Sequence, residues 1–446
     1  MSSARFSHRY DVLQGIADDV LKRARERGAT AAEAEVSDSY GQTVTVRMGE
    51  VETIEYNRDK GLSVTVYIGK KKGYASSADF AASAVADTVD AALSIARFTA
   101  SDECAGLADP ELLAREVRDL DLFHPWDLPV ERAIDMARTC EAAAFALDPR
   151  VVNSEGASVS SQQSQFVLAN SLGFSGGFPS SRHYVSCAVI ASDGAQMQRD
   201  DWYASQRAPE DLPAPAAVGD YAGRRALARL GSRKISTIEV PVLFEAPAAS
   251  GLISSFVSAA SGGNLYRKSS FLVDQLGSQV FSPVVTIVER PHLPRGQASS
   301  CFDDDGVATR ERDVVRQGML QGYFLGSYSA RKLGMKTTGN AGGNHNLIVQ
   351  SGEMDLPALI RETRTGLLVT ELMGQGINLV TGDYSRGAAG YWIDGGEIAY
   401  PAEEITIAGN LRDMFRNIVA VGSDVLIRGS RSTGSILVER MTVAGS

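Results

Sequence analysis

Apolar residues recur at every second position over much of the segment from Ala31 to Ala75, and this period constrains the fold more than any other feature. A period of two is typical of β-strands that have one buried face and one solvated face. The pattern is clearest at Val44, Val46 and Met48, and again at Leu62, Val64, Val66 and Ile68. We therefore predict three to five antiparallel strands in this segment.

Helical spacing of apolar residues precedes and follows these strands. Residues 12–24 carry apolar side chains on one helical face, and Gly28 stands where a helix C-cap is expected. Residues 85–96 show the same spacing after the strands. Both segments are predicted to be helices packed on the sheet.

The next part of the chain mixes one long helix with strands. The spacing predicts a helix over 130–147 and strands over 165–170, 184–192 and 195–203. Asp193-Gly194, between the last two strands, predicts a two-residue type I′ hairpin. Residues 208–218 contain three prolines and are predicted to be a linker, followed by a short helix over 220–230.

From about Lys234 onward, glycine-rich turns alternate with short apolar strands, and few helical runs occur. Helices are predicted chiefly at 248–260 and 411–418. The predicted fold class is α+β, with an N-terminal α/β region of antiparallel strands and packed helices followed by a β-rich C-terminal domain. The predicted domains are residues 1–117, 118–232 and 233–446.

Charge and cysteine content narrow the classes of function. Among 446 residues, Asp and Glu number 54 and Lys and Arg 44, for a net charge of -10. A basic surface that binds nucleic acid is therefore not expected. The four cysteines form no Cys-x-x-Cys pair and are predicted to be reduced thiols. The first ten residues lack a signal-peptide core and no stretch is long enough to span a membrane, so we predict a cytoplasmic protein without membrane contact.

The sequence does not match the common catalytic and metal-binding motifs, because either the spacing or the residue types differ. The five histidines are too far apart for a short-spaced zinc motif. Residues 301–312 approach a calcium loop, but Cys301 and Arg312 stand where oxygen ligands are needed, so the acidic residues are predicted to form a solvated turn. Ser175 lies in a Gly-x-Ser-x-Gly pattern but lacks the helix that must follow it. Two glycine-rich segments with polar residues remain, 339–346 and 381–390.

The second of these segments begins a longer stretch, Val380 to Ile418, that reads VTGDYSRGAAGYWIDGGEIAYPAEEITIAGNLRDMFRNI. This stretch resembles the TldD/PmbA family, on its PmbA (TldE) side. Three shorter segments, 152–158, 303–310 and 337–346, agree with it. The resemblance implies a two-subunit metallopeptidase that cleaves unfolded or small peptides in the bacterial cytoplasm, including peptide-antibiotic precursors and antitoxins.

The same resemblance implies how the two subunits differ. TldD-type subunits carry a His-Glu-x-x-x-His helix and a later Cys that hold zinc, with the Glu as general base. In this sequence the helix aligns with Gly251–Ser261, and its three key positions are Ser255, Phe256 and Ala260. The late Cys falls near Ser432-Thr433-Gly434. We therefore expect a non-catalytic chain without metal or cofactor, paired in a heterodimer or a larger assembly with a TldD-like subunit that carries the zinc.

The expected role of this subunit is to enclose the partner's site and help hold the peptide. An extended peptide pairs with a sheet edge through its main chain, which suits broad specificity. Candidate groove residues are Gly342, Gly343, Asn344, Asp383 and Arg386. Two alternatives remain open: an autonomous peptidase with a site around His345 and Asp383, and a non-enzymatic peptide-binding scaffold. In isolation, the chain could also pair with itself to form a homodimer.

Overall fold

The computed structural model describes residues 6–445. In it, the chain forms two compact units. The first contains the residues up to Leu227 together with Cys301–Ala308. The second contains Ala228–Ser300 and the residues from Thr309 onward. The three-domain division expected from the sequence stays a prediction.

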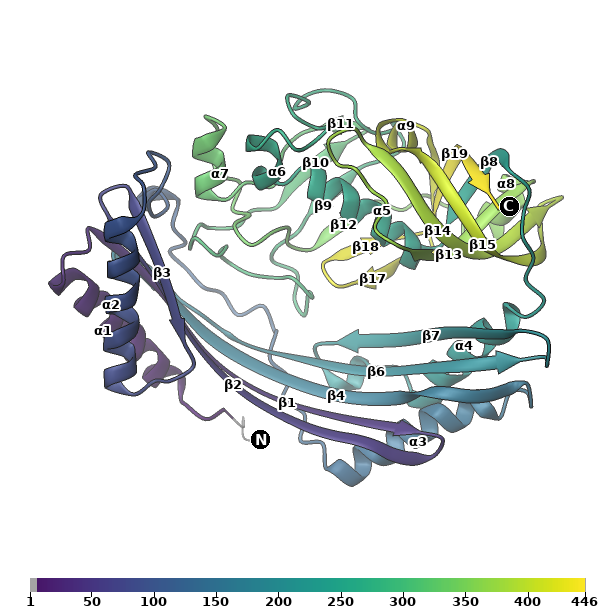
Figure 1. Cartoon of the computed structure of the whole chain (residues 1–446), viewed down its shortest axis with the longest axis horizontal. Helices are drawn as coiled ribbons and strands as arrows, with labels where there is room; N and C mark the ends of the chain where they lie inside the picture. Colours follow the sequence, from purple (N-terminus) through teal and green to yellow (C-terminus); the bar gives the residue numbers. More distant parts are fainter. Residues whose placement is uncertain (1–5, 446) are drawn as a thin grey trace. The chain divides into compact units, whose positions relative to one another are not determined.

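The first unit is built on one antiparallel sheet with the strand order β3-β2-β1-β4-β6-β7, and β5 pairs with β4 (Figure 1). Its strands are β1 (Ala31–Arg47), β2 (Glu50–Ile68), β3 (Lys71–Ser77), β4 (Val151–Asn170), β5 (Ser175–Gly176), β6 (Pro179–Ser192) and β7 (Met197–Gln206). The period-two segment thus forms three antiparallel strands, as predicted. Two of them are unusually long, and β1 pairs along most of its length with β4, more than a hundred residues later in the sequence.

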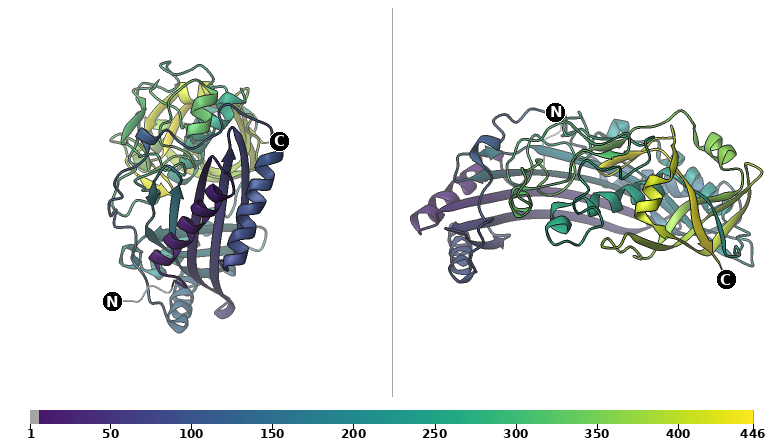
Figure 2. Two further views of the ribbon diagram at one scale, coloured as in Figure 1. Left: turned by 90° about the vertical axis from the view of Figure 1, so that its left-hand side faces the viewer. Right: turned by 90° about the horizontal axis from the view of Figure 1, so that it is seen from above.

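Helices cover one face of this sheet. They are α1 (Tyr10–Glu26), α2 (Ala82–Phe98) and α3 (Val130–Phe145), with α4 (Pro215–Ala228) following the last strand. The first two, purple and blue in Figure 2, lie against the same face, where their apolar residues share a core with Ala34, Val36 and Val64 of the sheet. The predicted packing of both flanking helices on the sheet is therefore confirmed. Helix α4 begins at Pro215, within the expected linker, because proline fits the first helical turn.

Two turn predictions need correction. The hairpin between β6 and β7 spans four residues, 193–196, and not two, because the Asp193 carboxylate accepts hydrogen bonds from the amides of both Ala195 and Gln196. The acidic turn at 303–305 is not fully solvated, since Asp303 is buried and accepts from the amides of Asp305 and Val307.

The second unit is β-rich, as expected, and holds two six-stranded sheets. One has the order β11-β10-β9-β12-β18-β17, and the other β15-β14-β13-β8-β19-β16. A further pairing of β15 with β19 closes five strands of the second sheet into a ring. The strands are β8 (Ile238–Phe244), β9 (Ile287–Glu289), β10 (Arg312–Arg316), β11 (Met319–Leu320), β12 (Leu347–Val349), β13 (Gly366–Met373), β14 (Asp383–Asp394), β15 (Glu397–Asn410), β16 (Ile418–Val421), β17 (Leu426–Arg428), β18 (Arg431–Thr433) and β19 (Ile436–Ala444).

Short helices complete this unit: α5 (Ala246–Ala259), α6 (Gly262–Tyr266), α7 (Ser327–Lys332), α8 (Leu356–Thr363) and α9 (Leu411–Arg416). Helix α5 contributes to the main core of the unit and packs against strands of both sheets, among them β13 and β18. The chain is therefore an α+β protein with the predicted β-rich C-terminal part. None of the helices between residues 6 and 445 is long and apolar enough to cross a membrane.

Candidate functional site

Helix α5 is the segment that the resemblance aligns with a zinc helix, and its side chains serve the core. Phe256 is fully buried, and its ring lies 5.0 Å from that of Phe281 and 6.3 Å from that of Phe415. Ser255 Oγ donates to the carbonyl of Gly251 in the same helix, at 3.3 Å. Ala260 follows the helix as its C-cap residue. Zinc in proteins takes nitrogen, sulfur or carboxylate ligands, so these three side chains do not fit it.

The position expected for the late cysteine lies beside α5. Helix α5 packs against β18, which contains Ser432 and Thr433. Thr433 is fully buried, and its hydroxyl donates to the carbonyl of Gly434 at 2.9 Å. The fold therefore brings together the segments that the resemblance assigns to zinc binding, with no thiol, imidazole or carboxylate at those positions. Over residues 6–445, no group of three or more His, Cys, Asp or Glu side chains is arranged to hold a metal ion.

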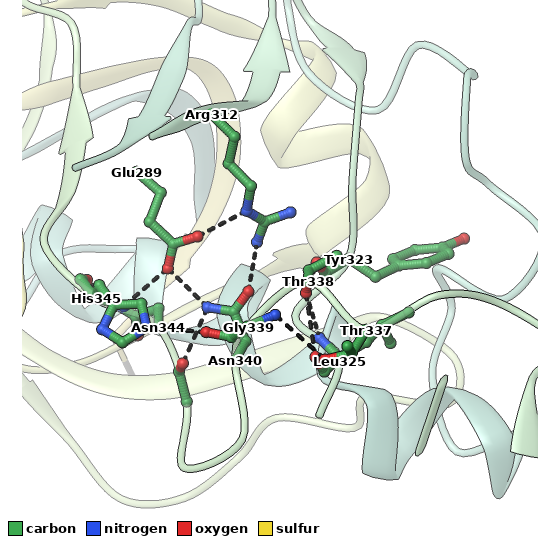
Figure 3. A network of polar contacts seen from close by, with 11 residues as sticks. Glu289, Arg312, Tyr323, Leu325, Thr337, Thr338, Gly339, Asn340, Asn344 and His345 are labelled. Atoms are coloured by element: carbon green, nitrogen blue, oxygen red, sulfur yellow. Dashed lines mark hydrogen bonds and ion pairs between the residues drawn. The ribbon is translucent and has the colours of Figure 1, made fainter. Parts of the chain in front are cut away.

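A polar network holds the glycine-rich loop 337–346 in place (Figure 3). Its centre is Glu289 at the end of β9, and the side chain of Glu289 is only 1% exposed. One carboxylate oxygen accepts from Arg312 Nε at 2.7 Å, and the other accepts from Asn340 Nδ2 and the amide of His345, both at 2.8 Å. Arg312 also donates to Asn340 Oδ1 at 3.0 Å. This charged pair, hydrogen-bonded to Asn340 and to the amide of His345, fixes the loop at both ends.

Residues 324 and 325 connect this loop to the end of α5. Thr338 Oγ1 accepts from the amide of Leu325 at 2.8 Å, and the Thr338 amide donates to the Leu325 carbonyl at 3.0 Å. The neighbouring Phe324 donates its amide to the carbonyl of Ala260 at 3.0 Å. The guanidinium of Arg312 lies 5.2 Å from the centre of the Phe324 ring. The loop therefore lies next to the helix end that carries the last position of the zinc motif.

Within the loop, the predicted groove residues differ in their surroundings. Gly342 and Gly343 are exposed and have φ angles of 88° and 125°, which glycine adopts without strain. Asn344 is half-buried, and its side-chain amide donates to the carbonyl of His345 and to Ser430 Oγ. Gly342 therefore lies exposed at the loop surface, the amide and carbonyl of Gly343 are both bonded to Asn340, and Asn344 ties the loop to the turn before β18.

The other two predicted groove residues lie on β14. Asp383 is exposed and accepts hydrogen bonds from Thr381 Oγ1 at 2.6 Å and Asn410 Nδ2 at 3.2 Å. Arg386 donates to the carbonyl of Met373 at 3.4 Å. Asn410 lines a cavity of about 580 Å³ between β15, α9 and β19. Among the described residues, no hydrogen bond or ion pair joins Asp383 or Arg386 to the loop 337–346, so the structure does not bring the five candidates into one contact network.

Sequence reasoning missed the pair formed by Glu289 and Arg312. In the sequence, each of these two residues is a charged residue at one end of a short strand that contains apolar residues. Only the pairing of β9 with β10 places the two side chains together. Sequence reasoning also missed Tyr384, which lies between Asp383 and Arg386 and is 2% exposed. Burial raises the pKa of Tyr384 to about 12, while the nearby guanidinium of Arg386 opposes this effect.

Comparison with known proteins identifies the family. Residues 32–96, 123–230 and 237–445 match, in order, models described as domain 1, the central domain and the C-terminal domain of the PmbA/TldA metallopeptidases. The chain is 49% identical to "Metalloprotease PmbA" of Escherichia coli O157:H7, over 93% of this chain and 92% of the relative. The chain belongs to the PmbA/TldD family. It is a PmbA-type member, since identity to a "Metalloprotease TldD homolog" of Haemophilus influenzae is 23%, over 84% of this chain and 81% of that one.

Solved structures agree with this assignment. A protein from Bacteroides thetaiotaomicron is 26% identical and superposes with a TM-score of 0.93, covering 98% of this chain and 99% of the other. TldE from Thermococcus kodakarensis is 20% identical with a TM-score of 0.82, covering 96% and 100%, and shares the fold. The names of the curated relatives support a metallopeptidase-type role for this PmbA-type chain.

Proposed function

We propose that this chain is the metal-free, PmbA (TldE)-type subunit of a two-subunit metallopeptidase. A TldD-like partner carries the zinc ion, and this chain completes the enclosure in which unfolded or small peptides are cleaved. By resemblance, the substrates include peptide-antibiotic precursors and antitoxins, and the site of action is the cytoplasm. The assembly is a heterodimer or a larger complex, and the isolated chain forms a homodimer.

One observation carries this proposal. The position that the resemblance gives to the general base is Phe256, a fully buried ring in an aromatic cluster. The two positions for histidine ligands hold Ser255, bonded within its own helix, and Ala260. None of these side chains binds zinc or accepts a proton from water at neutral pH. Hydrolysis by this family member therefore requires a metal ion from another chain.

The loop 337–346 supports the role in peptide binding. Its exposed Gly342 offers main chain beside the end of α5, and the Glu289 network holds the loop in place, with the amide and carbonyl of Gly343 bonded to Asn340. Main-chain hydrogen bonds bind an extended peptide without reading its sequence. We assign Gly342, Gly343, Asn344, Asp383 and Arg386 to the lining of the peptide groove.

The test compares this chain alone, a TldD-like protein alone and a mixture of both. The measurements are bound zinc per chain, the mass of the complex, and cleavage of an unstructured peptide with and without a chelator. We expect no stoichiometric zinc in this chain, a defined complex in the mixture, and chelator-sensitive cleavage only in the mixture. A TldD-like variant whose zinc-helix Glu is replaced by Gln is the matched control, and it is expected to bind this chain without cleaving the peptide.

Two results would contradict the proposal and favour an alternative. Zinc-dependent cleavage by this chain alone would indicate an autonomous peptidase. Absence of any complex and of any cleavage in the mixture would indicate a peptide-binding scaffold.

A further inference from the structure

The outer edge of β2 has no partner strand over most of its length. Strand β3 pairs with β2 only between Leu62 and Ile68. Residues 50–60 are exposed, and within residues 6–445 no strand pairs with their outer edge (Figure 1). The regular part of this edge is 53–60, because a bulge interrupts the pairing with β1 at Glu52. An unpaired strand edge offers a row of amide and carbonyl groups to another extended chain.

This edge is held in one conformation before anything binds to it. Strand β1 pairs with β2 along almost its whole length, and β4 supports the other side of β1. The tip of the β1–β2 hairpin is fastened to α3, where the buried Glu141 carboxylate accepts from the amides of Met48 and Gly49 at 2.9 and 2.7 Å. A strand fixed in this way loses little conformational entropy when an extended chain docks on it.

One face of this edge is negatively charged. The pairing with β1 places Thr53, Glu55, Asn57 and Asp59 on the same face of the strand. In the part of the chain that the structure describes, no basic side chain forms an ion pair with Glu55 or Asp59, whereas Glu52 lies 3.5 Å from Arg47 Nη1. The two residues are ~13 Å apart along the strand. Since the whole chain carries a net charge of -10, both the local and the long-range field favour a basic partner.

The opposite face of the edge carries basic and apolar side chains. Arg58 and Lys60 each lie over an aromatic ring of the same unit, at 5.6 and 5.3 Å from the ring centre. These two cations therefore lie on the face away from Glu55 and Asp59. Nearer the hairpin tip, Ile54 and Tyr56 are 44% and 53% exposed and offer apolar contact to a docked chain.

We infer that this edge binds an unfolded peptide that carries basic side chains and adds an antiparallel strand to β2. The pairings of β1 with β2 and β4, and of β2 with β3, are antiparallel as well. The bound peptide has Lys or Arg opposite Glu55 and Asp59, four residues apart, and apolar residues opposite Ile54 and Tyr56. Main-chain hydrogen bonds supply affinity without reading sequence, and the spacing of the two carboxylates supplies a preference for basic peptides.

Two other kinds of partner fit this edge less well. A nucleic acid is a polyanion, and the carboxylates on the edge repel it. A permanent subunit interface is built around a buried apolar core, whereas most side chains of residues 50–60 are charged or polar. An unfolded peptide needs only the main chain of the edge and the two carboxylates. The inference rests on the proposed function in one respect, which is that the bound peptide is a substrate.

Fluorescence anisotropy of a labelled Lys-Ser-Thr-Val-Lys-Val peptide, titrated with the full chain, tests the site. In antiparallel pairing its two lysines face Asp59 and Glu55, and its two valines face Tyr56 and Ile54. We expect saturable binding that weakens as salt is raised, and slower hydrogen exchange of amides within residues 53–60 when the peptide is bound. The same peptide with glutamate in place of both lysines is the control and is expected not to bind.

A double variant tests the role of the carboxylates. Glu55→Gln together with Asp59→Asn is expected to weaken binding of the lysine peptide at least about threefold. Asp18→Asn together with Glu26→Gln, at exposed positions of α1, removes the same charge from the same unit and is expected to leave binding unchanged. The difference between the two double variants reports the local contact and not the net charge of the chain.

Methylation of alternate peptide amides tests the strand pairing. The amides that face β2 lose their hydrogen bonds when they are methylated, so this derivative is expected to bind at least about tenfold more weakly. Methylation of the other set, which faces solvent, is expected to leave binding unchanged.

Three results would overturn the inference. They are a lysine peptide that does not bind this chain, one that binds the Glu55 and Asp59 double variant as tightly as the unsubstituted chain, and one that binds equally well with either set of amides methylated. Cleavage in the mixture with a TldD-like protein judges the proposed function separately, because peptide binding is measured with this chain alone.

Discussion

Glu33 is the carboxyl group whose environment is expected to make the first unit sensitive to pH. It is half-buried on β1, and burial raises its pKa from the ordinary value of 4.5 to about 8. The carboxylates of Asp305, Glu35 and Asp304 raise it further, whereas Lys72 lowers it. Two of these carboxylates belong to the segment 301–308, which comes from the C-terminal half of the sequence and packs in the first unit.

The sign of the effect follows from the direction of the shift. Between pH 4.5 and about 8 the folded state keeps the proton, whereas the unfolded chain releases it, so unfolding becomes easier as pH rises. Each pH unit is worth ~1.4 kcal/mol, which sets an upper limit of ~5 kcal/mol across this range. Because Glu33 keeps some contact with solvent, we expect ~2–4 kcal/mol.

Glu33→Gln removes the titration while preserving the shape of the protonated side chain. The variant is expected to match the natural chain near pH 4.5 and to exceed it in stability by ~2–4 kcal/mol at pH 8. Hydrogen exchange of residues 31–47 and 301–308, compared between the two proteins at each pH, measures this difference. Glu55→Gln, on the exposed part of β2, serves as the control and is expected to show no such trend. An equal effect of Glu33→Gln at pH 5 and pH 8, or a natural chain that is the more stable at pH 8, would refute the reasoning.

Three further substitutions test the packing around the candidate site and at the tip of the β1–β2 hairpin. Glu289→Ala leaves the half-buried Arg312 without its carboxylate and is expected to cost ~2–4 kcal/mol in urea unfolding, with faster hydrogen exchange in the loop 337–346. Glu311→Ala, at an exposed ion pair, is the control and is expected to cost under ~0.5 kcal/mol. Phe256→Ala opens a cavity in the aromatic cluster and is expected to cost ~3–5 kcal/mol in the same assay. Glu141→Ala removes the acceptor of two amides at the β1–β2 tip and is expected to weaken the local structure by ~1–3 kcal/mol, measured as exchange at residues 48 and 49.

The spacing of apolar residues in the sequence predicted whether most segments form a helix or a strand, because each such element buries one face. Leu62, Val64 and Val66 alternate in the sequence and are buried in the structure. The same pattern could not show that β2 continues for eleven further residues with neither face buried. Strand pairing between residues far apart in the sequence could not be predicted either, because the alternating pattern of β1 does not indicate that β4 is its neighbour.

Close approaches between elements also depend on the assembled fold. Gly73 of β3 is an example, because a Cβ atom there would lie 1.9 Å from the carbonyl oxygen of Ala92 in α2. The sequence shows a glycine at this position, but only the packing of the helix on the strand shows why no larger residue fits. The pairing of Glu289 with Arg312 was missed for the same reason. By contrast, the resemblance located the segments near α5 and β18 that the fold brings together.

The aromatic cluster around Phe256 determines what a carboxylate would meet at the position that the resemblance gives to the general base. A carboxylate at this position would lie among the rings of Phe281, Phe324 and Phe415. Burying an unpaired charge costs several kcal/mol, a large share of the stability of a typical domain. Restoring the general base by a single substitution would therefore destabilise the core before it created a metal site. Phe256, at the position that the resemblance gives to the general base, is thus part of the packing of the second unit, and this packing is what supports the proposal of a zinc-bearing partner.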